Sequence, residues 1–253
     1  FNQALVITIE LSIISLLAAT IIGIIVGLIN TSKSKSIIMK ILKAIANLYI
    51  YIIRGTPMLV QILIIYFGLG QMLRPTGFSW LNIGGTFTAG TVALSLNAGA
   101  YMAEIVRGGI ESVDHGQIEA ARSLGLTYGK TMKKIVLPQA LRTMLPSIIN
   151  QFIISIKDTS LLSVIGLAEL TNVGKTIAAT QSLHMMAVYC FMACYYLFIC
   201  TVLAQVSKVV GITEFTLDDV RSPSVRTAIF NHDAATTALD TALDYIVDYI
   251  VET

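Results

Sequence analysis

The sequence predicts an all-α protein that crosses a membrane through about five helices. The first observation is composition: of the 253 residues, 55% are hydrophobic and 13% are charged, whereas soluble globular domains carry about 25% charged residues. The mean hydropathy of +0.76 agrees with this difference. The second observation is that apolar residues gather into runs of the length that a helix needs to cross a bilayer, about 20 residues. The third is that Lys and Arg are concentrated in alternate connections between these runs.

Five apolar runs have approximately this length. The first run contains Glu10 near its start, and it carries Gly23 and Gly27 at a spacing that suits close packing of two helices in lipid. The ordinary use of glycine in a membrane helix is the alternative. No internal repeat is visible, although many ion-coupled carriers are built from repeats. We therefore predict membrane-spanning helices over residues 4–29, 57–73, 86–106, 145–165 and 184–206.

Residues 37–70 would form a helix of about 50 Å if they were continuous, which is too long for one simple span. Thr56 can serve as the N-cap of a new helix, and Pro57 suits the first helical position. We therefore expect an amphipathic helix with two lysines over 37–53, lying at the membrane interface, followed by a separate span. One continuous but kinked helix is the alternative.

The basic residues indicate the orientation, because connections rich in Lys and Arg stay in the cytoplasm. The connections 30–56 and 107–144 contain five and six Lys or Arg residues, whereas 74–85 and 166–183 contain one each. We therefore expect the N-terminus to lie outside the cell. The C-terminus and the connection 107–144 are then cytoplasmic.

The chain divides into two parts of opposite charge. Residues 1–210 contain fifteen Lys or Arg against seven Asp or Glu, whereas residues 211–253 contain two against eight. Within the second part, residues 233–251 have apolar side chains at helical spacing and aspartates on another face. We expect a transmembrane domain over 1–210 and an acidic tail over 211–253 that consists of a linker and a short helix. The tail could cover the basic cytoplasmic loops, contact a partner, or be foreign to the rest of the chain.

A pattern of small residues lies in the cytoplasmic segment, over about residues 111–142. Two successive alanines let a short helix approach another surface closely, a glycine allows a sharp turn, and a proline is expected to end a second helix. This arrangement predicts a compact pair of helices that docks on another protein. A solvated basic loop attracted to anionic lipid is the alternative from composition alone. The residues that carry the pattern are Glu119, Ala120, Ala121, Gly125, Ile135, Leu137 and Pro138.

The spacing of these seven residues resembles the EAA loop of bacterial ABC-importer permeases. Four other segments resemble the branch of this family that transports polar amino acids, so that the resemblance covers roughly residues 4–210. These segments are Arg54-Gly55-Thr56-Pro57 followed by Gln61, Tyr101 followed by Glu104-Ile105-Val106-Arg107-Gly108-Gly109-Ile110, Pro138-Gln139-Ala140-Leu141-Arg142, and Lys157-Asp158-Thr159-Ser160-Leu161.

The resemblance implies a type I ABC-importer permease fold and a multi-pass subunit of a bacterial cell membrane. It implies that the EAA loop passes the movement of an ABC ATPase dimer to the spans. A second permease copy or a paralogue would complete the pathway, and an extracytoplasmic solute-binding protein would deliver the amino acid. ATP and Mg²⁺ would be bound by the partner ATPase, and this chain would bind no cofactor.

The residues themselves predict no catalytic centre. Gly125 and Gly129, followed by Lys130, differ from a phosphate-binding loop because three residues separate the glycines where four are required, and no strand precedes them. The three histidines are scattered, and the three cysteines share one apolar run. We therefore expect a transport subunit that is not an enzyme, with no metal site and no nucleic-acid partner.

Polar side chains inside the predicted spans indicate a substrate pathway, because polarity within a membrane is costly. A free amino acid presents an ammonium and a carboxylate, which are bound by charged, hydroxyl and amide groups. Asp158 is the first candidate for binding the ammonium and Glu104 is the second. Neighbouring helix positions point about 100° apart, so Lys157 and Asp158 do not both face one ligand. The candidate residues are Asp158, Glu104, Lys157, Thr159, Ser160 and Asn97.

Several of these polar residues also have structural alternatives. Lys157 and Asp158 could pair with other groups of the protein, and Glu104 could pair with Arg107 three residues later on the same helix. Arg54 and Gln61 are expected to anchor and orient the second span.

Two other functions are compatible with a membrane protein of this size. An ion-coupled carrier or channel would need no ATPase, but about five spans without a repeat disfavour it. A non-transporting scaffold would only recruit a cytoplasmic partner through its loop, and it would have no need of costly polar residues within the spans.

Overall fold

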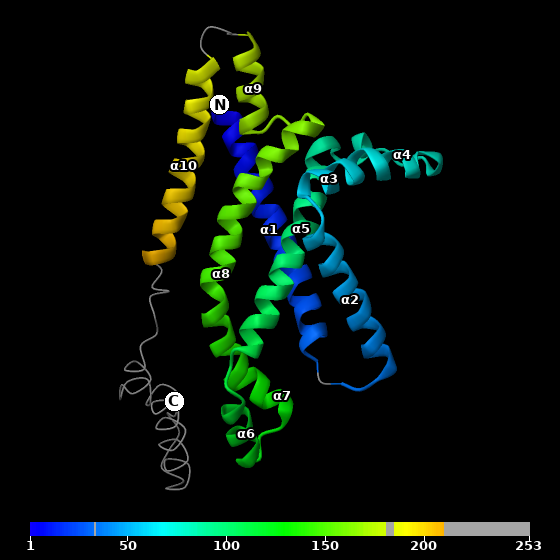
Figure 1. Ribbon diagram of the computed structural model, residues 1–253, viewed down its shortest axis with the longest axis vertical. Helices are drawn as coiled ribbons and strands as arrows, with labels where there is room; N and C mark the ends of the chain where they lie inside the picture. The colour runs from blue at the N-terminus through cyan, green and yellow to red at the C-terminus, as the bar shows by residue number, and fades with distance from the viewer. Residues whose placement is uncertain (33, 181–184, 210–253) are drawn as a thin grey trace.

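The computed structural model describes residues 1–32, 34–180 and 185–209, and every regular element in these ranges is helical (Figure 1). The predicted all-α class is therefore confirmed for the described part of the chain. The predicted acidic tail, residues 211–253, lies outside it. The α-helices are α1 (Asn2–Thr31), α2 (Ile37–Gly55), α3 (Met58–Leu63), α4 (Gly70–Leu73), α5 (Gly85–Glu111), α6 (His115–Ser123), α7 (Tyr128–Thr131), α8 (Leu137–Asp158), α9 (Leu170–Thr180) and α10 (Met185–Val209).

Short segments of other helix types extend or join these α-helices. Two of them are π-helical and three are 3-10 helices. They are η1 (Ile64–Leu69), η2 (Arg74–Thr76), η3 (Trp80–Ile83), η4 (Met132–Val136) and η5 (Thr159–Ile165).

α1 and α5 pack against each other at the centre of the bundle (Figure 1). Gly27 of α1 lies so close to α5 that a Cβ atom added there would be 2.7 Å from the Val106 Cγ1 atom. Gly23 is packed against Met102 in the same way. Since glycines at this spacing let two helix backbones approach each other, the packing role expected for the two glycines is confirmed.

Four segments among the described residues are long and apolar enough to cross a membrane: Asn2–Thr31, Met58–Thr76, Tyr128–Ile165 and Met185–Gln205. Each overlaps a predicted span. The remaining predicted span, 86–106, lies in α5, which is 27 residues long but is not among these four. Fourteen of its residues are buried, and most of these are Gly, Ala, Ser or other small residues. α5 is therefore less apolar because its side chains serve close packing between helices.

A break separates α2 from the second candidate span. Thr56 has an extended backbone, with φ −123° and ψ 148°, so the alternative of one continuous kinked helix is wrong. α3 begins at Met58, one residue later than predicted, because Pro57 occupies the N-cap position. From there the chain continues through η1 and α4 as an arm that projects sideways from the bundle (Figure 1). α2 itself packs on α1 and α5, and its place at the membrane interface stays a prediction.

The two prolines of α8, Pro138 and Pro146, do not end a helix. Pro138 stands in the first turn of α8, where the missing backbone N–H group costs little. Together α7, η4, α8 and η5 form a 38-residue helical path from Tyr128 to Ile165. The prediction that Pro138 stops a second loop helix is therefore wrong. Pro146 also lies inside α8 without ending it.

Candidate functional site

The connection between α5 and α8 forms a pair of short helices, at the end of the bundle opposite to the start of α1 (Figure 1). Asp114 caps α6, because its Oδ1 atom accepts a hydrogen bond from the Gly116 backbone N–H at 2.7 Å. The chain then turns at Gly125, whose φ of +82° favours glycine. The Leu126 N–H closes this turn by donating to the Ala121 carbonyl at 3.2 Å. The turn predicted at Gly125 is confirmed.

The seven predicted docking residues face in different directions. Glu119 is exposed and Ala120 is half-buried, so both are open to a partner surface. Ala121 is fully buried. The small Ala121 side chain therefore permits close packing inside the connection. It does not face a partner surface, although the sequence predicts that it does. Of the other four residues, Gly125 and Pro138 are exposed, whereas Ile135 and Leu137 are half-buried.

A hydrophobic cluster joins the two long helices on either side of this connection, and Ile118 of α6 packs against it. It combines the end of α5, the turn that follows α5, the end of η4 and the first half of α8. Since interiors of this kind are close-packed, this contact holds α6 against the ends of both long helices. Gln139 of α8 also donates a hydrogen bond to Gln117 of α6. The buried members of the cluster are Val106, Ile110, Val113, Val136, Ala140 and Met144.

Gln61 connects the break after α2 with the central helix α5. Its side-chain N–H group donates to the Ile53 carbonyl at 2.7 Å and to the Thr56 carbonyl at 3.1 Å. Its Oε1 atom accepts a hydrogen bond from Asn97 Nδ2 at 2.9 Å. The anchoring role expected of Gln61 agrees with these contacts. Asn97 is buried and is engaged within the chain.

Glu104 is held by two arginines. Its Oε2 atom lies 3.1 Å from Arg54 Nη1 and 3.0 Å from Arg107 Nη2, and Arg107 Nη1 lies 2.6 Å from Glu111 Oε2. Arg54 also lies over the ring of Tyr101, 5.4 Å from its centroid. The alternative in which Glu104 pairs with Arg107 is therefore confirmed, and its charge is already compensated within the chain.

Lys157 and Asp158 stand at the end of α8. Lys157 is exposed and Asp158 is half-buried, and the three ion pairs found among the described residues include neither. The alternative in which they pair with other charged groups is thus not seen in this part of the chain. Thr159 is fully buried and donates to the Ile156 carbonyl at 2.7 Å, whereas Ser160 is half-buried.

The six predicted pathway residues do not form one cluster. The position of Asp158 along α5 can be judged from Leu162, four residues later, which packs on α5 at Gly90. A Cβ atom added to Gly90 would lie 2.9 Å from Leu162 Cδ1. Glu104 is 14 residues further along α5, which corresponds to about 21 Å along the helix axis. Asp158 and Glu104 therefore lie at different depths of the bundle, and Asn97 lies between them along α5.

Sequence reasoning missed Glu169, a fully buried carboxylate immediately before α9. Its oxygens accept hydrogen bonds from the Thr171 and Asn172 backbone N–H groups at 2.7 and 2.6 Å, and from the Tyr196 hydroxyl at 3.2 Å. Burial raises the pKa of the Glu169 carboxyl, and these hydrogen bonds oppose that shift. The sequence signal that could have identified this cap was an acidic residue directly before a helical segment. These contacts make Glu169 a cap that ties α9 to α10.

The chain is similar to permease proteins of several bacteria. The chain matches the family model of the binding-protein-dependent transport system inner membrane component over residues 19–211. It is 41% identical over 201 residues to the glutamine transport system permease protein GlnP of Escherichia coli K12, covering 79% of this chain and 86% of that protein. It is 41% identical over 167 residues to the arginine transport system permease protein ArtQ of Bacillus subtilis (66% and 71% covered). It is 39% identical over 215 residues to the nopaline transport system permease protein NocM of Agrobacterium fabrum (83% and 85%).

Solved structures show the same fold. A chain from the crystal structure of an amino acid ABC transporter with histidines superposes with a TM-score of 0.73 at 35% identity, covering 83% of this chain and 92% of that one. A chain of the inward-facing MetNI methionine ABC transporter gives 0.64 at 19% identity, covering 84% and 96%, which shows the fold alone. The predicted type I permease fold is thus confirmed. This chain belongs to the family of binding-protein-dependent transport system inner membrane components, the permeases of ABC importers.

Proposed function

We propose that this chain is the membrane-spanning subunit of an ATP-driven amino-acid importer. In this proposal it forms the translocation pathway together with a second permease copy or a paralogue. The observation that carries the proposal is the EAA-like motif, which begins on α6, turns at Gly125 and ends at the start of α8. One hydrophobic cluster packs this connection against α5 and α8. The relatives GlnP, ArtQ and NocM are named for the transport of glutamine, arginine and nopaline, which supports an amino acid as substrate.

In the proposed mechanism, an ABC ATPase dimer docks on α6 and α7 and binds the ATP and Mg²⁺. Glu119 and Ala120 contact the ATPase, and Gly125 sets the angle between the two helices. The half-buried Ile135 and Leu137 carry the displacement into α8. Since the separation of the ATPase subunits depends on nucleotide, the docked helices bias the bundle between inward-open and outward-open states.

The proposed orientation places α6 and α7 in the cytoplasm and the N-terminus outside, with the C-terminus cytoplasmic. The basic connections support it, and α6 and the start of α1 lie at opposite ends of the bundle (Figure 1). A solute-binding protein then delivers the amino acid at the end where α1 starts.

Within the pathway, we assign the substrate ammonium to Asp158. It is half-buried and has no ion-pair partner among the described residues. The half-buried Ser160 supplies a hydroxyl group beside it, whereas the Thr159 hydroxyl is buried and already donates to the Ile156 carbonyl. Lys157, one position away and exposed, is the basic group of the same segment. Glu104 and Asn97 already have partners in the chain, so we give them a structural role.

Reconstitution with the ATPase and the binding protein tests this function. Vesicles that contain the complex are offered a panel of radiolabelled amino acids, with ATP on the side of α6 and α7. We expect uptake of a subset of polar amino acids that depends on ATP hydrolysis and persists when ion gradients are collapsed. Uptake that follows an ion gradient and ignores ATP would identify an ion-coupled carrier. Absence of all transport, with the ATPase still docked, would favour a scaffold.

A further inference from the structure

The helix α8 exposes two sides of different character. Successive helix positions point about 100° apart, so four exposed polar residues of α8 fall within an arc of about 80°. The half-buried Ile154 is an apolar residue of the same arc. The opposite side is apolar and exposes Leu141 and Leu145. The four polar residues, here called the polar face, are Thr143, Ser147, Asn150 and Lys157.

Lipid tails do not suit the polar face as a covering. Ser147, Asn150 and Lys157 lie within the predicted span 145–165, in a segment that is long and apolar enough to cross a membrane. The Ser147 and Asn150 side chains make no hydrogen bond within the described part of the chain. Because lipid tails offer no hydrogen-bond partner, polar groups at membrane depth face a water-filled cavity or another protein surface.

The polar face runs from the proposed ammonium site toward the end of the bundle that carries α6 and α7 (Figure 1). Lys157 is next to Asp158, and Thr143 lies in the half of α8 nearer to α6. These two ends of the face are about 21 Å apart along the helix axis, which is most of the hydrocarbon thickness of about 30 Å. Since side chains on a helix tilt toward its N-terminus, each polar group leans in the direction of the α6–α7 end.

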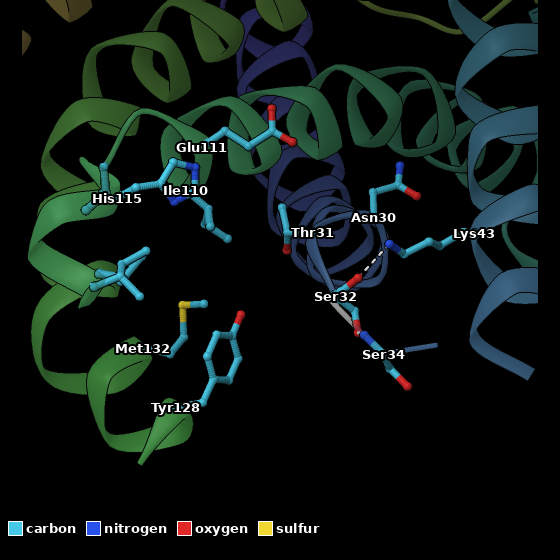
Figure 2. A pocket seen from close by; sticks show the side chains of 13 residues that line it. Asn30, Thr31, Ser32, Ser34, Lys43, Ile110, Glu111, His115, Tyr128 and Met132 are labelled. Atoms are coloured by element: carbon cyan, nitrogen blue, oxygen red, sulfur yellow. Dashed lines mark hydrogen bonds between the residues drawn. The ribbon is translucent and has the colours of Figure 1, made fainter. Parts of the chain in front are cut away.

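A pocket of about 710 Å³ beside the α6–α7 connection is a separate space (Figure 2). Its walls come from the ends of α1 and α5 and from α2, α6, α7 and η4. None of the described residues that line it belongs to α8. The polar face therefore does not open into this pocket.

We propose that the polar face lines a water-filled exit route, along which the amino acid moves from Asp158 toward the cytoplasm. The continuity of the face with Asp158 favours this route over a contact with another protein surface. The inference rests on the proposed function, which supplies the substrate and the direction of transport.

The groups of the polar face suit a zwitterion that is leaving its site. Lys157 points about 100° away from Asp158, so it takes the substrate carboxylate once the ammonium has left Asp158. The Asn150 amide and the Ser147 hydroxyl can each donate and accept hydrogen bonds, so they suit both ends of the amino acid. Neutral groups at successive positions hold the amino acid weakly, which lets it leave.

Cysteine labelling tests the exit route without relying on transport. Ser147→Cys and Asn150→Cys are compared with Leu145→Cys, which lies at nearly the same depth on the apolar side of α8. Each permease–ATPase complex is held in lipid nanodiscs and treated with a membrane-impermeant cationic methanethiosulfonate, with and without ATP. The wild type, whose three cysteines all lie in α10, sets the background. Because the reagent attacks the thiolate, which apolar surroundings disfavour, we expect the first two variants to be labelled about tenfold faster than Leu145→Cys.

Two other coverings of the polar face give different results. Labelling of all three variants at one rate, or at the background rate, assigns the face to lipid and overturns the route. Oxidation that joins two permease chains through Asn150→Cys, without labelling by the reagent, assigns the face to a contact between two copies and also overturns it.

The role of the face in transport is read from the initial rate of ATP-driven uptake into vesicles. Asn150→Leu removes the amide from the middle of the face and should slow uptake about tenfold, with the ATPase still bound. Leu145→Met changes an exposed residue on the apolar side and should transport like the wild type. Uptake by Asn150→Leu at the wild-type rate overturns the role of Asn150. Failure of the proposed function is distinct, because it abolishes ATP-driven uptake by the wild type while the labelling pattern still stands.

Discussion

Asn97 of α5 donates its side-chain amide to Gln61 Oε1 at 2.9 Å, and the amide of the same Gln61 caps the end of α2 by donating to the Ile53 and Thr56 carbonyls. Both side chains are buried, at 6% and 7% exposure. One side chain therefore satisfies backbone groups that the break leaves without a helical partner, and it fixes the break to the central helix. The contact explains how α2 and α3 keep a defined angle without a continuous helix.

Gln61→Leu should lower the free energy of unfolding by about 1–3 kcal/mol, because it leaves the Asn97 amide and two carbonyls without their partner in a buried place. Thermal unfolding in detergent measures the effect as a lower Tm. Gln71→Leu makes the same change on the exposed part of the arm and should leave the Tm unchanged. Equal Tm values for the two variants would show that the Gln61 contacts do not contribute to stability.

The docking proposal predicts that Glu119→Lys and Gly125→Pro both abolish co-purification of the ATPase. The first change reverses a charge on the exposed face of α6, and the second forbids the φ of +82° at the turn, since proline holds φ near −65°. Insertion into the membrane should survive both changes, which fractionation would show. Lys40→Glu reverses a charge on α2 and should retain the ATPase. Retention of the ATPase by Glu119→Lys and Gly125→Pro would remove the docking role of α6 and α7.

Local features of this fold could be predicted from the sequence. The apolar run of α1, the break at Thr56 and the turn at Gly125 depend on a few neighbouring residues, and each is present. Pro138 was misjudged because one proline is compatible with either the end or the first turn of a helix, and sequence does not say which. Ala121 was misjudged because composition does not show which face of α6 turns inward.

The partners of the polar residues could not be predicted, because they lie far apart in sequence. Arg54 and Glu104 meet across 50 positions, and Gln61 and Asn97 across 36. Each pair depends on how α2 and α3 cross α5, which is set by packing and not by any local pattern. The same crossing decides that Glu104 is neutralised by arginines, whereas Asp158 keeps no ion pair among the described residues.

Asp158→Asn should slow uptake about tenfold or more if the side chain binds the substrate ammonium, since a charge-assisted contact contributes about 1.5–3 kcal/mol. The initial rate of uptake in vesicles is measured together with ATPase co-purification, which should not change. Glu104→Gln is the informative comparison, because Glu104 is paired with Arg54 and Arg107. We expect that change to lower the Tm and to leave the substrate concentration at half-maximal uptake near its original value. Wild-type uptake by Asp158→Asn would give this residue a structural role.

The close approach of α1 and α5 predicts opposite effects of the same substitution at two glycines. Gly23→Ala adds a methyl group that would collide with the Met102 side chain and would lie 2.9 Å from the Met102 carbonyl carbon. Because backbone atoms cannot move aside as a flexible side chain does, α1 has to shift away from α5, at a cost of about 1–3 kcal/mol. Gly108→Ala lies within α5, where a Cβ atom meets nothing within 4 Å, and alanine is the better helix former by about 0.5–1 kcal/mol. Thermal unfolding in one detergent should therefore place Gly23→Ala below the wild type and Gly108→Ala at or above it. A Gly23→Ala protein as stable as the wild type would mean that the two helices are not locked together at this point.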